Sequence, residues 1–316
     1  MPVLDYKVEN RFDDDTRLLQ ITAAVPEQRS DPGVKPPMGG GTDKIEGDAA
    51  KNLTADIVFV MDLTKSMGPY VDMTKETIAQ LARTVTKDPE ISKAVKFGIV
   101  GYRDDIKTIP GLEFTAKNFT PTLLEDEQFI ELVNKEVRTT LVDSQDYAEE
   151  VYAGIKEALT STQWRPTGPH FLVLIGDASA HDPGYPQSTT GLDALGVHNL
   201  PEWDNVINAF AIHLRDEKFK VDWEIAERQF GTIATNDESK KPALFLVDVT
   251  KPADFKEAAD KISKDIALVI ADAKKTNVVD PSKIAVAIPV LSESGEATKP
   301  STITPPVLSE TGGGGA

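Results

Sequence analysis

The sequence contains no cysteine and no long apolar run, and each absence excludes a class of protein. Without cysteine the chain has no disulfide framework, no thiolate nucleophile and no zinc–thiolate site. No apolar stretch approaches the roughly 20 residues that a membrane-spanning helix requires. The first residues also lack the basic start and apolar core of a signal peptide. These absences do not fix the compartment and leave two open, the cytoplasm and, if the chain is part of a longer anchored protein, the periplasm.

Positive charge is scarce as well. The 34 Lys and Arg residues face 51 Asp and Glu residues, which gives a formal net charge of −17 and a pI of about 4.7. This balance argues against nucleic acid or an anionic membrane as a partner, and it favours cations or basic surfaces. With 316 residues, 40% of them hydrophobic, the chain is long enough to build a proper core.

An oxygen-rich loop follows a buried-strand pattern near the start of the main domain. The unbroken apolar run 57–61 predicts a strand that is buried on both faces. Asp62, Thr64 and Ser66 come directly after it, and helical spacing begins at about residue 71. We therefore place these three side chains on a strand-to-helix loop at the carboxyl edge of a sheet, where open α/β sheets bind ligands. The simpler alternative is that Asp62 only caps the helix.

Strand and helix patterns alternate along the rest of the main domain, which predicts an α/β fold with a doubly wound, mostly parallel sheet flanked by helices. Further strands are expected at 94–102, 170–176, 208–214 and 243–249, and helices at 71–82, 124–139, 147–159 and 255–274, with short edge pieces at 113–115 and 118–120.

The two ends of the chain differ from this middle in composition. Residues 1–50 form an N-terminal extension and linker with one candidate strand at 17–25, and 51–275 form the domain. Residues 276–316 are rich in Pro, Ser, Thr and Gly and are expected to form a flexible tail, with one strand candidate at 286–291.

Hard oxygen ligands without a thiol or imidazole suit Mg²⁺ or Mn²⁺ rather than zinc or copper. The pattern Asp62-x-Thr64-x-Ser66 after an apolar strand resembles the metal-ion-dependent adhesion site (MIDAS) of the von Willebrand factor A (vWA) family, where it is usually Asp-x-Ser-x-Ser. That family adds a ligand from a second loop and an Asp after a later strand. Asp177, at the end of strand 170–176, matches the Asp.

The second loop is the least certain match to the family. The run 143–149 stands where many bacterial members have Gly-Gly-Gly-Asp-x-Pro-Glu, and Asp146 is the best match, with Ser144 and Thr140 as alternatives. The resemblance covers about residues 54–272 and implies a Rossmann-like vWA fold and one Mg²⁺ or Mn²⁺. The implied metal ligands are Asp62, Thr64, Ser66, Asp146 and Asp177. It also implies a protein partner that supplies an acidic side chain to the ion.

A narrower resemblance lies in three segments, 176–185, 188–193 and 209–214. They are similar to the vWA domain that accompanies bacterial serine/threonine kinases of the type VI secretion system, and in part to vWA domains linked with alpha-kinases. The kinase motifs themselves do not occur in the chain: it has no Gly-rich phosphate loop, strand lysine, His-Arg-Asp or Asp-Phe-Gly. The resemblance therefore implies a bacterial, non-catalytic accessory domain, not an enzyme.

Other interpretations remain open at this point. The cation can be purely structural and tie three loops together, or it can activate water in a Mg²⁺-dependent hydrolase. An aspartyl-phosphate phosphatase is excluded because Thr64 stands where such enzymes need an acid. We expect His181 to anchor its loop by a hydrogen bond, His170 and His213 to pack in the core, and 103–105 to form a solvated turn.

Overall fold

The computed structural model describes residues 7–8, 17–18, 53–206, 208–236 and 242–276. Its contacts divide the chain into two units, Met1–Lys44 and Ile45–Ala316. In the first unit, β1 (Lys7–Val8) pairs antiparallel with β2 (Arg17–Leu18). The strand predicted at 17–25 overlaps β2 at its first two residues. Its remainder, and the strand predicted at 286–291, lie outside the described residues.

The second unit contains a six-stranded sheet of order β5-β4-β3-β6-β7-β8. Every neighbouring pair is parallel except β4 and β5. This confirms the predicted α/β class and the mostly parallel sheet. The strands are β3 (Ala55–Asp62), β4 (Val95–Tyr102), β5 (Ala116–Asn118), β6 (His170–Gly176), β7 (Asn208–Arg215) and β8 (Leu244–Asp248).

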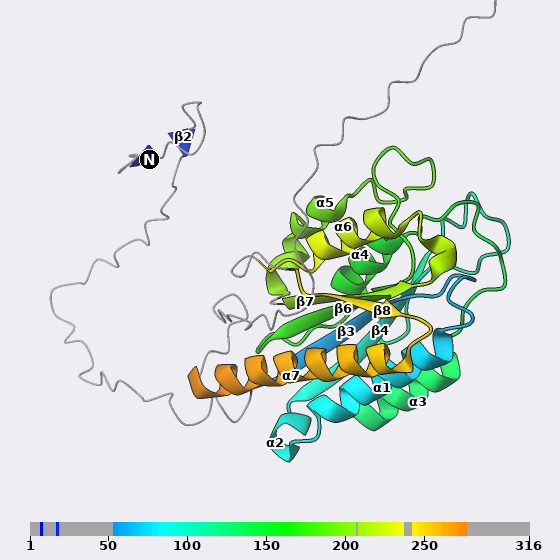
Figure 1. Cartoon of the computed structure of the whole chain (residues 1–316). Helices are drawn as coiled ribbons and strands as arrows, with labels where there is room; N and C mark the ends of the chain where they lie inside the picture. The colour runs from blue at the N-terminus through cyan, green and yellow to red at the C-terminus, as the bar shows by residue number, and fades with distance from the viewer. Residues whose placement is uncertain (1–6, 9–16, 19–52, 207, 237–241, 277–316) are drawn as a thin grey trace, which may run out of the picture. The chain divides into compact units, whose positions relative to one another are not determined.

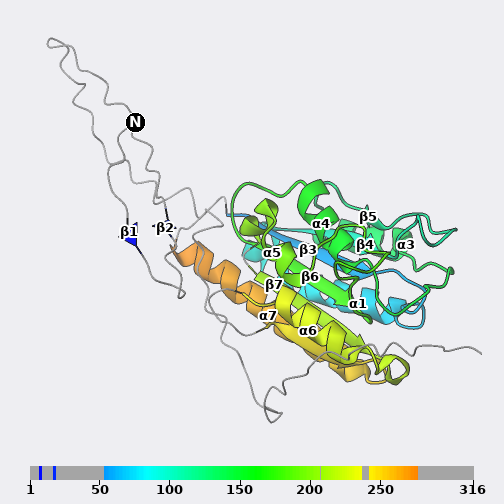
Figure 2. The same ribbon diagram turned by 90° about the horizontal axis from the view of Figure 1, so that it is seen from above.

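Helices cover both faces of the sheet, with α1, α3 and α7 on one side and α4, α5 and α6 on the other (Figure 1). Figure 2 shows α6 and α7 on the side of β7 and α3 on the side of β5. The helices are α1 (Val71–Val85), α2 (Pro89–Ser92), α3 (Asp126–Glu136), α4 (Val151–Ser161), α5 (Ala194–His198), α6 (Trp223–Ile233) and α7 (Pro252–Thr276), with 3₁₀ turns η2 (Pro201–Asn205) and η3 (Glu217–Phe219). No helix in the described ranges is both long and apolar enough to cross a membrane.

The central strand β3 is buried along its whole length, because helices pack on both faces of the sheet. On the α1–α3–α7 face, the ring of Phe129 stacks on Phe59 and Phe97, with ring centroids 5.6 and 5.4 Å apart. On the other face, Tyr102 and Tyr152 are fully buried among aliphatic side chains. Two cores thus hold β3 in place, which fixes the position of the loop after Asp62.

The sheet reverses its winding direction at β3. The chain passes from β3 to β4 on one side and later enters β6 on the other. A crevice at the carboxyl ends of the strands is expected at such a switch point. Asp62 ends β3 and Asp177 follows β6, so the topology places both carboxylates at this crevice.

Two local predictions differ from the structure. The antiparallel edge strand is β5, which begins after the piece predicted at 113–115 and overlaps the piece predicted at 118–120 only at Asn118. Its register is set by the pairing of Ala116 with Tyr102 rather than by apolar alternation. The segment 103–105 is buried, not a solvated turn. The guanidinium of Arg103 anchors this segment by donating hydrogen bonds to the carbonyl oxygens of Leu63 (3.2 Å) and Arg138 (3.1 Å).

Two helical glycines provide a matched test of the packing that positions α4. A Cβ on Gly154 in α4 would lie 2.8 Å from Cδ1 of Tyr102, whereas one on Gly231 in α6 would meet nothing closer than 3.7 Å. Gly154→Ala is therefore expected to destabilise the protein by about 1–3 kcal/mol through overpacking. Gly231→Ala is expected to stabilise it by up to about 1 kcal/mol through helix propensity. Urea denaturation measures both, and a shift of equal sign in the two variants would contradict the packing described.

Candidate metal centre

The first loop of the site is folded by its own side chains. The backbone N–H and the hydroxyl of Thr64 both donate to Asp62 Oδ1, at 2.8 and 2.6 Å. The Thr64 hydroxyl lies 2.9 Å from that of Ser66. A turn in which an Asp accepts from the residue two positions later is a common local motif. Here it gathers three oxygen-bearing side chains at the end of β3.

The loop after β6 joins this group. The Ser66 hydroxyl donates to Asp177 Oδ1 at 3.1 Å. The structure thus brings together four of the five predicted residues: Asp62, Thr64, Ser66 and Asp177. Adjacent parallel strands account for the convergence, because β3 and β6 are paired to their ends and both loops leave the same edge.

The second loop brings two carboxylates, Asp146 and Glu149, to the cavity beside the first and third loops. Asp146 is exposed, and its Oδ1 lies 3.4 Å from His181 Nε2. Glu149 is 2% exposed, and its Oε1 accepts a hydrogen bond from the Ser144 hydroxyl at 3.1 Å. Thr140 is instead used in the backbone turn, where its N–H donates to the Leu63 carbonyl. Asp146 as a metal ligand therefore stays a prediction, and Glu149 is a further candidate.

A cavity of about 340 Å³ opens over these loops. Its lining includes Ser66, Asp146, Glu149 and Asp177, together with the exposed side chain of Tyr147. Both second-loop carboxylates therefore face the same open space as the first and third loops. A ligand entering from solvent would reach oxygen atoms from all three loops.

The electrostatics of the site are unfavourable without a cation. Burial and then the negative charge of Asp177 raise the pKa of Asp62 well above its usual range. Burial raises the pKa of Asp177 to about 6. Burial, followed by the charges of Asp62 and Asp104, does the same to the pKa of Glu149. Each shift records the cost of holding a negative charge in a low-dielectric, acidic environment.

Unsatisfied oxygen atoms show that the residues present fit a hard divalent cation. Asp62 Oδ2, Asp177 Oδ2 and Glu149 Oε2 are buried and have no hydrogen-bond partner among the described residues. Buried carboxylate oxygens without partners are uncommon and costly. Converging carboxylate and hydroxyl oxygens are the donors that Mg²⁺ and Mn²⁺ prefer.

Comparison with known proteins agrees with this geometry. The family model of the von Willebrand factor type A domain matches residues 56–218, just over half of the chain, and this range contains all three loops. The chain belongs to the von Willebrand factor type A domain family.

Two curated proteins are similar to part of this vWA chain. C-type lectin domain-containing protein 160 of Caenorhabditis elegans is 25% identical over 154 residues, 48% of this chain and 23% of its own length. Alpha-protein kinase vwkA of Dictyostelium discoideum is 27% identical over 131 residues, 41% of this chain and 19% of its own length. The matches therefore span about a fifth of those two relatives.

Among solved structures, proximal thread matrix protein 1 from the mussel byssus, described with a zinc-occupied MIDAS motif, is 15% identical, with a TM-score of 0.44. The similarity covers 72% of this chain and 47% of that protein.

The raised carboxylate pKa values predict how the metal-free protein responds to pH. Between about pH 4 and pH 6 the native state holds a proton on Asp177 that the unfolded state has lost, so stability falls as pH rises through this window. The loss for this one group is on the order of 1–3 kcal/mol. Asp177→Asn removes the charge and is expected to flatten the profile and to raise stability at pH 7.

Urea denaturation in EDTA from pH 4 to pH 7 measures this effect. Glu131→Gln, at an exposed position of α3, is the matched control and should leave the profile unchanged. A wild-type protein that gains stability over the same window, with no change in Asp177→Asn, would show that burial does not raise the pKa of Asp177.

Proposed function

We propose that this vWA domain is a divalent-cation-dependent protein-interaction module. The observation that carries the proposal is the set of buried, unpartnered carboxylate oxygens of Asp62, Asp177 and Glu149, of which the last two residues line one open cavity. We assign the ion as Mg²⁺ or Mn²⁺ and its ligands as Asp62, Thr64, Ser66 and Asp177. For the second loop we favour the buried Glu149, whose charge is coupled to Asp62 and Asp177, over the exposed Asp146.

The partner class follows from the chemistry of the bound ion. Ser66 is half-buried and lines the cavity, so an ion beside it is reachable from outside. A carboxylate is the side chain that a hard cation binds best. We therefore propose that an Asp or Glu of a partner protein completes the coordination and that the ion joins the two proteins. The chemistry of the ion supplies the attraction, and the cavity shape supplies selectivity.

The competing function is a structural cation. Three buried carboxylates neutralise more of the ion's charge than hydroxyl ligands would, which weakens its pull on a further carboxylate. In that case the ion ties the three loops together and partners bind elsewhere. The finer proposal that the domain serves a kinase signalling or secretion system rests on the sequence resemblance and on the partial match to alpha-protein kinase vwkA.

Calorimetric titration of Mg²⁺ into EDTA-stripped protein tests the site itself. We expect one saturable site in the wild type, no binding in Ser66→Ala or Asp62→Asn, and unchanged binding in Thr122→Ala, which removes an exposed hydroxyl elsewhere. At 100 times Kd the ion should stabilise the fold by about 2.7 kcal/mol. This corresponds to a rise in Tm of about 5–11 °C. Equal binding by Ser66→Ala and the wild type would place the ion elsewhere.

Selection of peptides tests the role of the ion in partner binding. A random peptide library displayed on phage is panned against the immobilised full chain in Mg²⁺, with a parallel panning in EDTA. If the ion joins the partners, peptides enriched only in Mg²⁺ should share an acidic residue, and replacing it with its amide should weaken binding at least about tenfold. Peptides that bind equally in EDTA and in Mg²⁺ would instead support the structural cation.

A further inference from the structure

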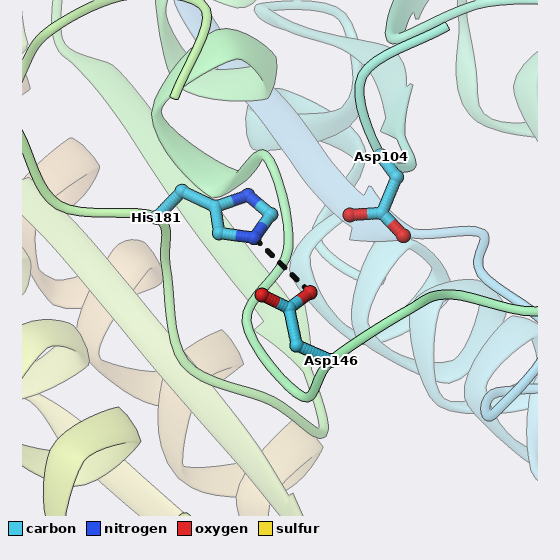
Figure 3. Close-up of side chains that lie close together, drawn as sticks. All are labelled: Asp104, Asp146 and His181. Atoms are coloured by element: carbon cyan, nitrogen blue, oxygen red, sulfur yellow. Dashed lines mark hydrogen bonds and ion pairs between the residues drawn. The ribbon is translucent and has the colours of Figure 1, made fainter. Parts of the chain in front are cut away.

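A second group of possible ligands lies beside the first site. Asp104, which follows β4, Asp146 from the second loop and His181, which follows β6, each offer an atom within 4.8 Å of the others. Figure 3 shows the three side chains turned toward one another from separate loops. The cluster differs from the first site because it contains an imidazole nitrogen. The inference drawn from this cluster is independent of the function proposed above.

Asp104 provides an independent reason to look for a ligand in this cluster. Its side chain belongs to a residue that is 1% exposed, and its Oδ1 has no hydrogen-bond partner in the part of the chain that the structure describes. The carboxylate faces Asp146 and His181 (Figure 3). A buried, unpaired carboxylate oxygen is costly unless a cation or a donor reaches it. The cluster therefore contains a buried carboxylate with one unpartnered oxygen.

The orientation of His181 is fixed by a buried carboxylate. Its Nδ1 lies 3.2 Å from Glu150 Oε1, and the Glu150 side chain also accepts hydrogen bonds from the backbone N–H (3.1 Å) and hydroxyl of Thr189. When Nδ1–H donates to Glu150, the lone pair of Nε2 faces Asp146, at 3.4 Å from its Oδ1. That separation is long for a hydrogen bond. A carboxylate behind a histidine whose other nitrogen points at further ligands is the arrangement that metal sites use.

We propose that Asp104, Asp146 and His181 bind a second divalent cation of the transition-metal class, with Zn²⁺ as the preferred ion. One imidazole nitrogen and two carboxylates match the ligands of zinc and of related ions such as Co²⁺, and they disfavour Mg²⁺. Such an ion would join the loop before α4 to the loops after β4 and β6. By joining these loops, the ion would hold in place the part of the cavity wall to which Glu149 belongs.

The alternative is an ion pair without metal. If His181 is protonated on both nitrogens, it can donate to Glu150 and Asp146 at once, and the acidic cluster is then partly neutralised by the imidazolium. The two arrangements differ in what occupies Nε2, a metal or a proton. The experiment must therefore report on His181 itself.

Proton NMR of the full chain with Co²⁺ as the probe makes this distinction. The double variant Ser66→Ala with Asp177→Asn removes the first site, and Co²⁺ is titrated into it. We expect one bound equivalent and one far-shifted, exchangeable imidazole N–H resonance, which marks a coordinated histidine. The signal should disappear in His181→Gln and persist in His198→Gln, which changes a histidine that contacts Trp203 outside the cluster. The chain has four histidines, so the assignment is tractable.

Two further variants keep the test decisive if His181→Gln fails to fold. Asp146 is exposed, so Asp146→Asn should fold normally and weaken Co²⁺ binding about tenfold or more. Equimolar Zn²⁺ should remove the shifted resonance, and millimolar Mg²⁺ should not. A folded protein that shows no shifted imidazole resonance, or a signal and an affinity unchanged by Asp146→Asn, would overturn the proposal and identify the cluster as an ion pair.

Discussion

The burial of three neighbouring carboxylates, Asp62, Glu149 and Asp177, is the constraint on which the site depends. These carboxylates are almost fully buried, and no Lys or Arg forms an ion pair with them in the described part of the chain. Two hydrophobic cores hold β3 and its neighbours rigidly enough to keep the charges together. A site assembled in this way binds a cation with little reorganisation, since folding has already placed the ligands. A small divalent cation would offset the free-energy cost of burying these carboxylates.

The parts of the fold that the sequence predicted are those with strong local signals. Unbroken apolar runs identified the buried strands, and Asp62 and Asp177 were found because each ends such a run. Thr64 and Ser66 followed from their spacing in one short loop. Once the sheet is parallel, the carboxyl ends of neighbouring strands must share an edge, so sequence order alone brought these residues together. The structure adds their hydrogen bonds, which no pattern encodes.

The remaining residues depend on contacts between distant segments. Asp146 and Glu149 stand three positions apart in an irregular loop, and nothing in that loop's sequence says which one is buried. The backbone of Glu149 instead pairs with the segment after β6, where its N–H donates to the Ser179 carbonyl at 2.8 Å and its carbonyl accepts from the His181 N–H at 3.0 Å. Asp104 is similar, since the run 103–105 looks solvated until Arg103 reaches the carbonyls of Leu63 and Arg138. The burial and position of a loop residue could therefore be predicted only where the residue directly follows a strand.

The acidic second loop gives the two neighbouring clusters different chemistry. Glu149 belongs to the wall beside the all-oxygen site, whereas Asp146 contacts an imidazole that Glu150 orients. A hard ion and a softer one would therefore bind a few residues apart without competing for the same ligands. Burial and then the charges of Asp62 and Asp104 raise the pKa of Glu149. An ion on Asp104, Asp146 and His181 would offset the charge of Asp104 beside Glu149.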